Sequence, residues 1–288
     1  MFNKKILIPF LALALVSMAC SININLPSIR TVKTGPTQTE DIQVPVPETS
    51  RTASLTLSFG AGTLDITSGA GSDLVTGTAT YNVADLKPDV TVNNNQVRIE
   101  QGNLKGNTIP NLGNNVKNEW DLKLGDTEMD LRINAGAYSA NYELGGLALT
   151  DLEISDGAAD VSLSFNEPNQ AEMDAFRYTT GASNVDLEGL ANANFTDMYF
   201  RSGAGSYTLD FSGDLKRDAN ISIDSGVSTV KVIVPEGVNA RLSFDGSLSN
   251  VSTNGSWSKS NGDYVMNGSG PTLTFVVKMG AGTLELSN

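Results

Sequence analysis

A glycine-centred unit recurs along this chain and limits the folds it can adopt more than any other feature. In each copy two apolar residues alternate with other residues, a Gly with a small neighbour follows, and two more alternating apolar residues complete the unit. The regular copies are centred on Gly136, Gly157, Gly181, Gly203, Gly226 and, in a degenerate copy, Ser247. The spacings are 21, 24, 22, 23 and 21 residues, and further copies surround Gly60 and Gly280. Such a period is typical of repeat folds, in which each repeat packs mainly against its neighbours.

Each half of the unit is predicted to form a strand with one buried face, because its apolar residues recur with a period of two. In the copy around Gly203, Met198 and Phe200 precede the glycine, and Tyr207 and Leu209 follow it. Phe200 and Tyr207 are seven positions apart, an odd number, so the chain must turn a corner to keep both pairs inside. Gly accepts unusual backbone angles, and a neighbouring Ala is small enough to stack on its copy in the next unit.

We therefore predict an all-β fold, a right-handed single-stranded β-solenoid. A period near 22 residues gives a contour of ~73 Å at ~3.3 Å per residue, which suits one coil with its strands ~4.8 Å from those of the next. The right hand follows from the general preference of parallel β connections. The alternative is an antiparallel β-sandwich in which each Gly-Ala pair is a hairpin tip. Tight tips favour Asn-Gly, whereas the units carry Gly-Ala-Gly or Gly-Ala-Ser, which favours the solenoid.

Two regions depart from the regular spacing. Between Gly60 and Gly136, several strand-like runs surround a Gly- and Asn-rich loop. Residues 51–130 are therefore predicted to form an N-terminal β subregion, and residues 131–288 the solenoid. Asn261-Gly262, between Trp257 and Tyr264, predicts a hairpin insertion at about 254–270, since this dipeptide favours two-residue turns.

The N-terminus has the layout of an export signal. Residues 1–5 form a short basic segment, and residues 6–16 form an apolar one. Small residues then lead to Cys20, the one cysteine of the chain. The apolar run is short for a transmembrane helix, which needs about 20 residues. Residues 1–19 resemble a bacterial lipoprotein signal peptide, which implies cleavage before Cys20 and lipidation of that residue. Ser17 departs from the Leu that such signals favour, so an ordinary signal peptide or an uncleaved anchor is the alternative.

Residues 20–50 contain four prolines and show no periodicity, so we predict a flexible tether there. With the lipid on Cys20, the protein is expected to be extracytoplasmic. It would be anchored to the bacterial cell membrane or outer membrane.

The composition excludes several classes of site. The chain has 19 Lys and Arg against 32 Asp and Glu, a net charge of −13, which disfavours nucleic acid as a partner. It has no His, so neither a Ser-His-Asp triad nor a His-ligated metal site can form. Carboxylate, Lys or Tyr chemistry remains open to an enzyme. We predict no cofactor and no metal.

Two segments carry a family resemblance. Residues 34–39 (TGPTQT) resemble the entry segment of toast-rack lipoproteins, and residues 225–235 (SGVSTVKVIVP) resemble a coil of the C-terminal domain of cell-wall-antibiotic-response proteins. The chain is similar over residues 34–288 to the bacterial toast-rack family of surface adhesins. That resemblance implies a right-handed β-helix at the cell envelope. It brings no established catalytic residues, so none are assigned.

Few residues stand out as candidates for chemistry or binding. Asp156, Asp160, Asp186 and Asp224 could include a carboxylate pair for glycan cleavage, but the pattern places each in a turn or on an exposed strand face. Calcium could bind such carboxylates, although no loop has the ligand spacing.

The hairpin aromatics Trp257 and Tyr264 are the candidate binding residues. The alternative is that they pair with each other across the hairpin and steady it.

The sequence thus predicts a non-catalytic, lipid-anchored cell-envelope protein that acts as an adhesin or surface interaction module. A polysaccharide-active enzyme using carboxylates on a β-helix and an envelope-stress sensing module are the alternatives. The expected partners are the membrane, through the lipid, and an envelope polysaccharide or surface protein. Self-association is predicted through the terminal coil, around Phe275 to Leu286, because an uncapped coil leaves a free sheet edge.

Overall fold

The computed structural model describes residues 30–48, 51–104, 110–111 and 115–288. Strands make up most of this part of the chain, and its helices are the short 3₁₀ turns η1 (Ala84–Leu86) and η2 (Leu190–Ala193). The predicted all-β class is confirmed. Over these residues, no helix has the length and apolar character that crossing a membrane requires. Residues 1–19 and Cys20 lie outside the described part.

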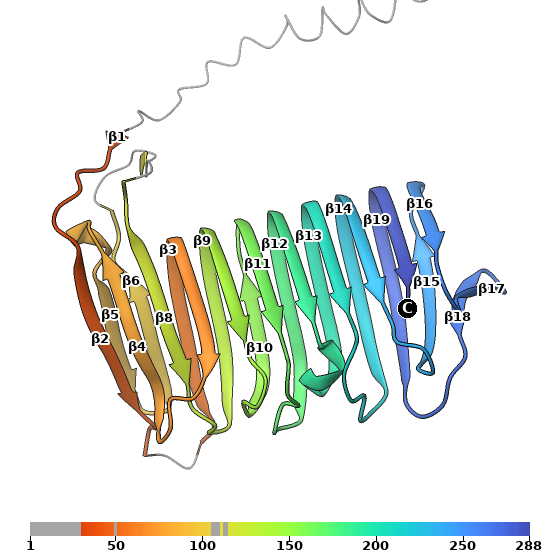
Figure 1. Ribbon diagram of the computed structural model, residues 1–288, viewed down its shortest axis with the longest axis horizontal. Helices are drawn as coiled ribbons and strands as arrows, with labels where there is room; N and C mark the ends of the chain where they lie inside the picture. Colours follow the sequence, from red (N-terminus) through yellow and green to blue (C-terminus); the bar gives the residue numbers. More distant parts are fainter. Residues whose placement is uncertain (1–29, 49–50, 105–109, 112–114) are drawn as a thin grey trace, which may run out of the picture.

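Six long strands each hold a complete unit, with both halves and the central glycine. They are β3 (Ala53–Ser68), β9 (Met129–Glu143), β12 (Met173–Glu188), β13 (Phe195–Asp210), β14 (Ala219–Ile233) and β19 (Thr272–Ser287). The unit around Gly157 is divided into β10 (Leu149–Ser155) and β11 (Ala158–Ser164). Each long strand bends at its middle, so its halves lie in two facing layers (Figure 1). We call the layer of the halves before the bend the first face, and the other layer the second face.

Neighbouring units run parallel, with equivalent residues side by side. Phe200 of β13 pairs with Tyr178 of β12 on one side and with Ile223 of β14 on the other. Strand β3, which the sequence places in a separate subregion, pairs with β9 over nearly its whole length. The antiparallel sandwich is therefore wrong for the glycine-centred units, and β3, within the expected N-terminal subregion, pairs directly with β9 of the stack.

The predicted apolar pairs fill the space between the two faces. Met198, Phe200, Tyr207 and Leu209 are all buried. The rings of Phe200 and Tyr207, which lie on opposite sides of the bend, pack with their centroids 5.3 Å apart. Burying a side chain of this size contributes about 2 kcal/mol. The odd spacing between these two residues predicted this corner.

The hydrogen-bonded pairing also closes into a small barrel. Strand β9 pairs with both β10 and β11, and β12 pairs with both from the opposite side. The ring arises because the unit around Gly157 is interrupted at its bend while its neighbours are continuous. The single-stranded solenoid and its right-handed winding stay predictions.

The central glycines stack directly at the bend. A Cβ atom on Gly136, Gly181, Gly203 or Gly226 would lie 2.3–2.5 Å from the carbonyl oxygen of the glycine below it in the stack. Real Cβ atoms do not approach oxygen so closely, so the bend requires glycine for its close backbone approach.

The N-terminal end of the stack is built by strands that leave β3 and return. Those strands are β4 (Asp73–Tyr81), β5 (Pro88–Asn93), β6 (Gln96–Gln101) and β8 (Asn118–Leu124), with β2 (Gln38–Pro45) outermost on the second face. Both β6 and β8 pair in parallel with β3, on the edge opposite β9. Strand β2 falls within the expected tether, so the tether cannot extend through residues 38–45. A separate pair joins β1 (Arg30–Thr31) to β7 (Pro110–Asn111).

The C-terminal end is also out of sequence order. It contains β15 (Asn239–Asp245), β16 (Leu248–Thr253), β17 (Ser258–Ser260) and β18 (Asp263–Met266). The last strand, β19, lies between β14 and the β15–β16 unit. Both edges of β19 are therefore paired, so residues 275–286 do not form the free terminal coil expected for self-association. Asn261-Gly262 forms the two-residue turn between antiparallel β17 and β18, where the sequence predicts a hairpin.

Candidate functional site

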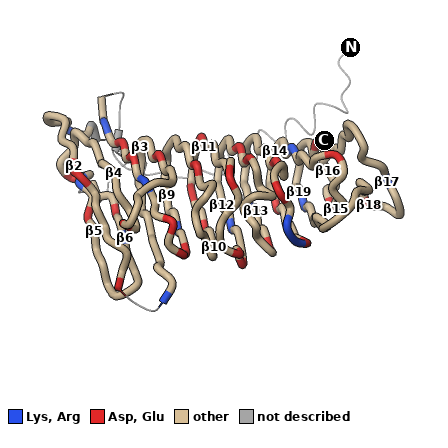
Figure 2. The backbone as a smooth tube through the Cα atoms, turned by 60° about the horizontal axis from the view of Figure 1, so that its bottom comes forward, with Lys and Arg blue, Asp and Glu red and all other residues tan. Residues whose placement is uncertain are grey.

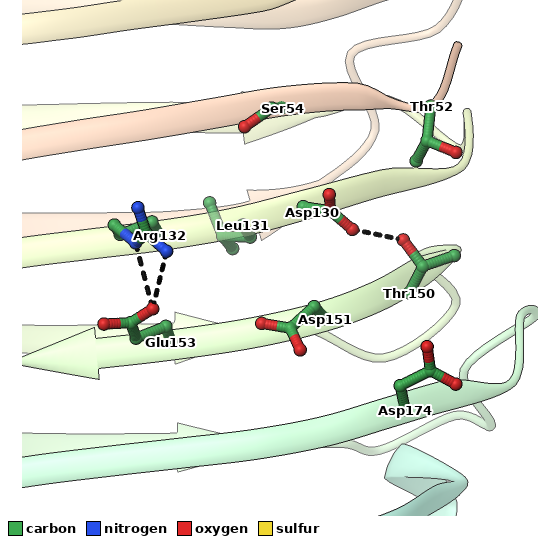
Figure 3. Close-up of a pocket in the computed structure, with 9 residues that line it drawn as sticks. All are labelled: Thr52, Ser54, Asp130, Leu131, Arg132, Thr150, Asp151, Glu153 and Asp174. Carbon is green, nitrogen blue, oxygen red and sulfur yellow. Dashed lines mark hydrogen bonds and ion pairs between the residues drawn. The ribbon is translucent and has the colours of Figure 1, made fainter.

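A groove on the outside of the first face is the best candidate for a binding site. Its volume is about 510 Å³. It is lined by Thr52, Ser54, Asp130, Leu131, Arg132, Thr150, Asp151, Glu153 and Asp174 (Figure 3). These residues come from β9, β10, β12 and the start of β3, so strands rather than loops position most of the groove.

An irregularity in strand pairing shapes the groove. Leu149 pairs with Met129, but Asp151 pairs with Asp130, so Thr150 is an extra residue in β10. The hydroxyl of Thr150 donates a hydrogen bond of 2.7 Å to Asp130 Oδ1. Such bulges re-aim side chains and are common beside functional sites.

Ion pairs organise the charges along the groove. Arg132 donates from Nε and Nη2 to Glu153 Oε2 at 3.0 and 2.7 Å. Arg177, just beyond the groove, donates to Asp151 Oδ2 at 2.8 Å, and this bond raises the pKa of the guanidinium. Asp174 is exposed and makes no ion pair within the described residues. The lining thus holds four carboxylates and one guanidinium, which matches the acidic excess along the stack (Figure 2).

An exposed aromatic ring extends this surface. Tyr199 pairs with Arg177 across the β12–β13 ladder, and the Arg177 Cζ atom lies 5.8 Å from the ring centroid. Tyr199 is 39% exposed, so one side of the ring remains available to a partner. An aromatic face beside carboxylates and guanidinium groups suits contact with a sugar or a polar peptide.

Nothing in the described ranges brings three metal-ligating side chains together. Of the four aspartates considered for glycan cleavage, Asp160 and Asp186 are exposed on the second face and Asp224 is exposed on the first. Asp156 is buried at the bend. The structure therefore does not join these aspartates into one site.

Asp156 is the centre of a buried hydrogen-bond network. Tyr178 and Tyr138 donate to Asp156 Oδ2 at 2.9 and 3.3 Å, and the Thr180 hydroxyl donates to Oδ1. Burial raises the pKa of Tyr138, Tyr142 and Tyr178 above the usual phenol value, and the Asp156 carboxylate raises each further. These phenols therefore stay protonated, and Tyr138 and Tyr178 act as hydrogen-bond donors to Asp156.

Replacing Asp156 with Leu is expected to destabilise the protein by about 2 kcal/mol, because buried hydroxyls would lose their acceptor. Urea unfolding followed by circular dichroism measures this loss. Asp156→Asn keeps an acceptor oxygen and is the control, with an expected loss of about 1 kcal/mol or less. Equal losses in the two variants would show that the hydrogen bonds are not what Asp156 provides.

The two hairpin aromatics are not the exposed pair that the sequence suggested. Trp257 is 6% exposed and donates from Nε1 to the Ser287 carbonyl at 3.2 Å, so it belongs to the core. Tyr264 is partly buried and pairs with Lys259, whose Nζ lies 5.2 Å from the ring centroid. Trp257 is thus unavailable as a surface binding residue, and the cross-hairpin partner of Tyr264 is Lys259.

Sequence reasoning missed the groove because no single unit contains it. Its charged lining residues stand four to seven positions before a central glycine, on three neighbouring strands. Aligned on the glycines, the position four before reads Arg132, Glu153, Arg177 and Tyr199. This alternation of charge, which ends in an aromatic residue, was the sequence signal that could have indicated the groove.

The sequence matches the family described as the N-terminal domain of toast_rack, DUF2154, over residues 33–177 and again over 175–233. These matches cover more than half of the chain. The chain belongs to the toast-rack family. A comparison of this toast-rack chain with curated proteins found no match.

Solved structures resemble this toast-rack chain to different degrees. A candidate cell adhesion protein from Clostridium sporogenes is 20% identical, with 88% of this chain and 99% of that one covered and a TM-score of 0.50. A candidate adhesin from Bacteroides fragilis is 10% identical, covering 89% and 99%, with a TM-score of 0.33. A candidate lipid binding protein from Parabacteroides distasonis is 9% identical, covering 90% and 99%, with a TM-score of 0.38.

Proposed function

We propose that this toast-rack chain is a non-catalytic cell-envelope protein that acts as an adhesin-like interaction module. In this proposal the lipid on Cys20 holds it at the membrane, and the stacked units form a right-handed solenoid that presents the first-face groove. The name of the Clostridium sporogenes protein agrees with an adhesive role. The expected partner is a hydroxyl-rich envelope polysaccharide or the surface of another envelope protein.

The groove is the observation that carries the proposal. Asp130, Asp151, Glu153 and Asp174 project from adjacent strands, and the ion pairs of Arg132 and Arg177 hold part of this set in place. Hydrogen bonds from sugar hydroxyls to carboxylates are stronger than those between neutral groups. Because the strands are rigid, a partner would not have to order the groove before binding.

Binding of the protein to soluble peptidoglycan fragments and purified wall polysaccharide, measured by calorimetry, tests the proposal. Asp130→Asn combined with Asp174→Asn is expected to weaken binding about tenfold, because a hydrogen bond to a charged group contributes about 1.5–3 kcal/mol. Asp160→Asn combined with Asp186→Asn, both exposed on the second face, is the matched control and should bind as the native protein does.

Two results would contradict the proposal. One is equal weakening by the groove and control variants, which would point to the net charge rather than the groove. The other is shortening of the polysaccharide during the assay, seen as new reducing ends, which would favour the polysaccharide-active enzyme.

A further inference from the structure

The two faces end at different strands at the C-terminal end of the stack. The first face continues from β19 through β15 to β18 and β17, whereas the second face stops at β16. Among the described strands, the residue-by-residue pairing joins β16 to β19 alone. The other edge of β16 therefore presents N–H and C=O groups without a strand partner (Figure 1).

This edge lacks the features that normally protect a free strand. The outermost strands at the opposite end carry such features: Glu40, Asp41 and Pro45 in β2, and Pro88 and Asp89 in β5. Charged residues and prolines on edge strands discourage pairing with another chain. The six residues of β16, LSNVST, include neither a charged residue nor a proline.

An exposed apolar strip adjoins the same edge. Leu248 is 78% exposed and Val227 is 66% exposed, the highest values among the large apolar side chains of the described residues. Ala281 pairs with Val227 on one side and with Leu248 on the other, so the three form one row across the bend. The earlier units have Ala in this row, at Ala182 and Ala204. Exposed apolar groups gathered in one place mark interaction sites.

We propose that the free edge of β16 accepts one extended polypeptide segment of a partner protein as an added strand of the second face. The segment would lie opposite β18, in the position that the second face leaves empty. Main-chain hydrogen bonds provide the affinity in this mode of recognition, and alternate side chains provide the specificity. This inference concerns a different surface from the groove and does not rest on the proposed function.

The shape of the edge favours a single strand over a second copy of the protein. The β17–β18 hairpin extends the first face beyond β16 (Figure 1), so another sheet approaching edge to edge would meet the hairpin. A single strand fits beside β16, in the empty position of the second face that lies opposite β18.

The charges and the burial pattern define the chemistry of the segment. The net charge of −13 favours a segment that is neutral or basic. Val251, on the inner side of β16, is only partly buried, so alternate apolar residues in the segment would cover it.

A peptide with the sequence of residues 228–234 (STVKVIV) serves as the probe, because it alternates apolar residues, carries one Lys and has residues 228–233 in the second-face half of β14. Binding of the labelled peptide to the protein is measured by fluorescence polarisation. The same peptide N-methylated at alternate residues cannot donate its main-chain hydrogen bonds and should bind at least about tenfold more weakly. Equal affinities for the two peptides would overturn the proposal.

A matched pair of protein variants tests the position of the site. Asn250 and Asn184 occupy the same outward row of the second face, but Asn250 lies on the edge strand and Asn184 on the interior strand β12. Asn250→Lys should weaken binding of the Lys-containing peptide about tenfold, whereas Asn184→Lys should not. Light scattering of the protein alone gives its mass. A dimer that Asn250→Lys dissociates would identify a second copy as the occupant and overturn the single-strand proposal, as would equal effects of the two variants.

Discussion

Gly203→Ala is expected to destabilise the protein by about 3 kcal/mol, because the added methyl group meets a backbone atom that cannot move alone. The new Cβ would lie 2.4 Å from the carbonyl oxygen of Gly181. Relieving that contact requires separating β12 from β13, which are paired on both sides of the bend. The midpoint of urea unfolding, followed by circular dichroism, measures the change.

Gly35→Ala is the matched control for the same chemical change. A Cβ on Gly35 would lie 3.7 Å from the Asn82 carbonyl oxygen, which is ordinary van der Waals contact. This substitution should leave stability unchanged or raise it by about 0.5 kcal/mol, because Ala reduces the entropy of the unfolded chain. If Gly203→Ala were tolerated as well as Gly35→Ala, the central glycines would not be required for close stacking.

The structure of the unit could be predicted because the apolar alternation within each unit identifies its own buried side chains. The alternation of Met198 and Phe200, and of Tyr207 and Leu209, reports which side chains face inward, and the odd spacing between the two pairs reports the bend. Stacking at the glycines follows from the same spacing, since equivalent residues of neighbouring units pair directly. These features depend on one unit and its copies, so a periodic pattern is enough to find them.

The order of the units at the two ends could not be predicted in this way. A unit with alternating apolar residues buries the same faces wherever it is stacked. Its pattern therefore does not identify which unit packs beside it. Leu284 of β19 pairs with Val230 on one side and Val251 on the other, and all three have the same apolar character. The insertion of β19 is therefore decided by how the hairpin and its connections close the end of the core.

The candidate sites were hidden for two different physical reasons. Asp156 is polar but buried, because Tyr138, Tyr178 and Thr180 from neighbouring units satisfy its carboxylate, and such partners are not visible within one unit. The groove depends on the extra residue Thr150. In the sequence it appears only as a spacing of three between the apolar residues Leu149 and Leu152, where their partners in β9 are two apart. Both features arise from relations between units.

Trp257→Ala is expected to cost about 4 kcal/mol, since truncating a buried Trp combines lost burial with a cavity that the surroundings fill only in part. Trp257 is buried with Met266 of β18 and Leu286 of β19 in the main core cluster, so it helps to close the core where β16 is the last strand of the second face. The loss should be seen in urea unfolding and as faster amide hydrogen exchange in β15, β16 and β18. Exchange in β9 and β12 should change least, because each unit contacts mainly its neighbours.

A structural role for Trp257 makes a different prediction from the surface role that the sequence suggested. Trp257→Phe retains much of the buried ring and loses the hydrogen bond to the Ser287 carbonyl, so it should cost only about 1 kcal/mol. The binding of wall polysaccharide to the groove should be the same in Trp257→Phe as in the native protein, because the groove lies on β9, β10 and β12. A variant that kept its stability and lost binding would restore Trp257 as a contact residue. It would also require the hairpin to open in solution, since the indole is 6% exposed and its N–H is already bonded within the core.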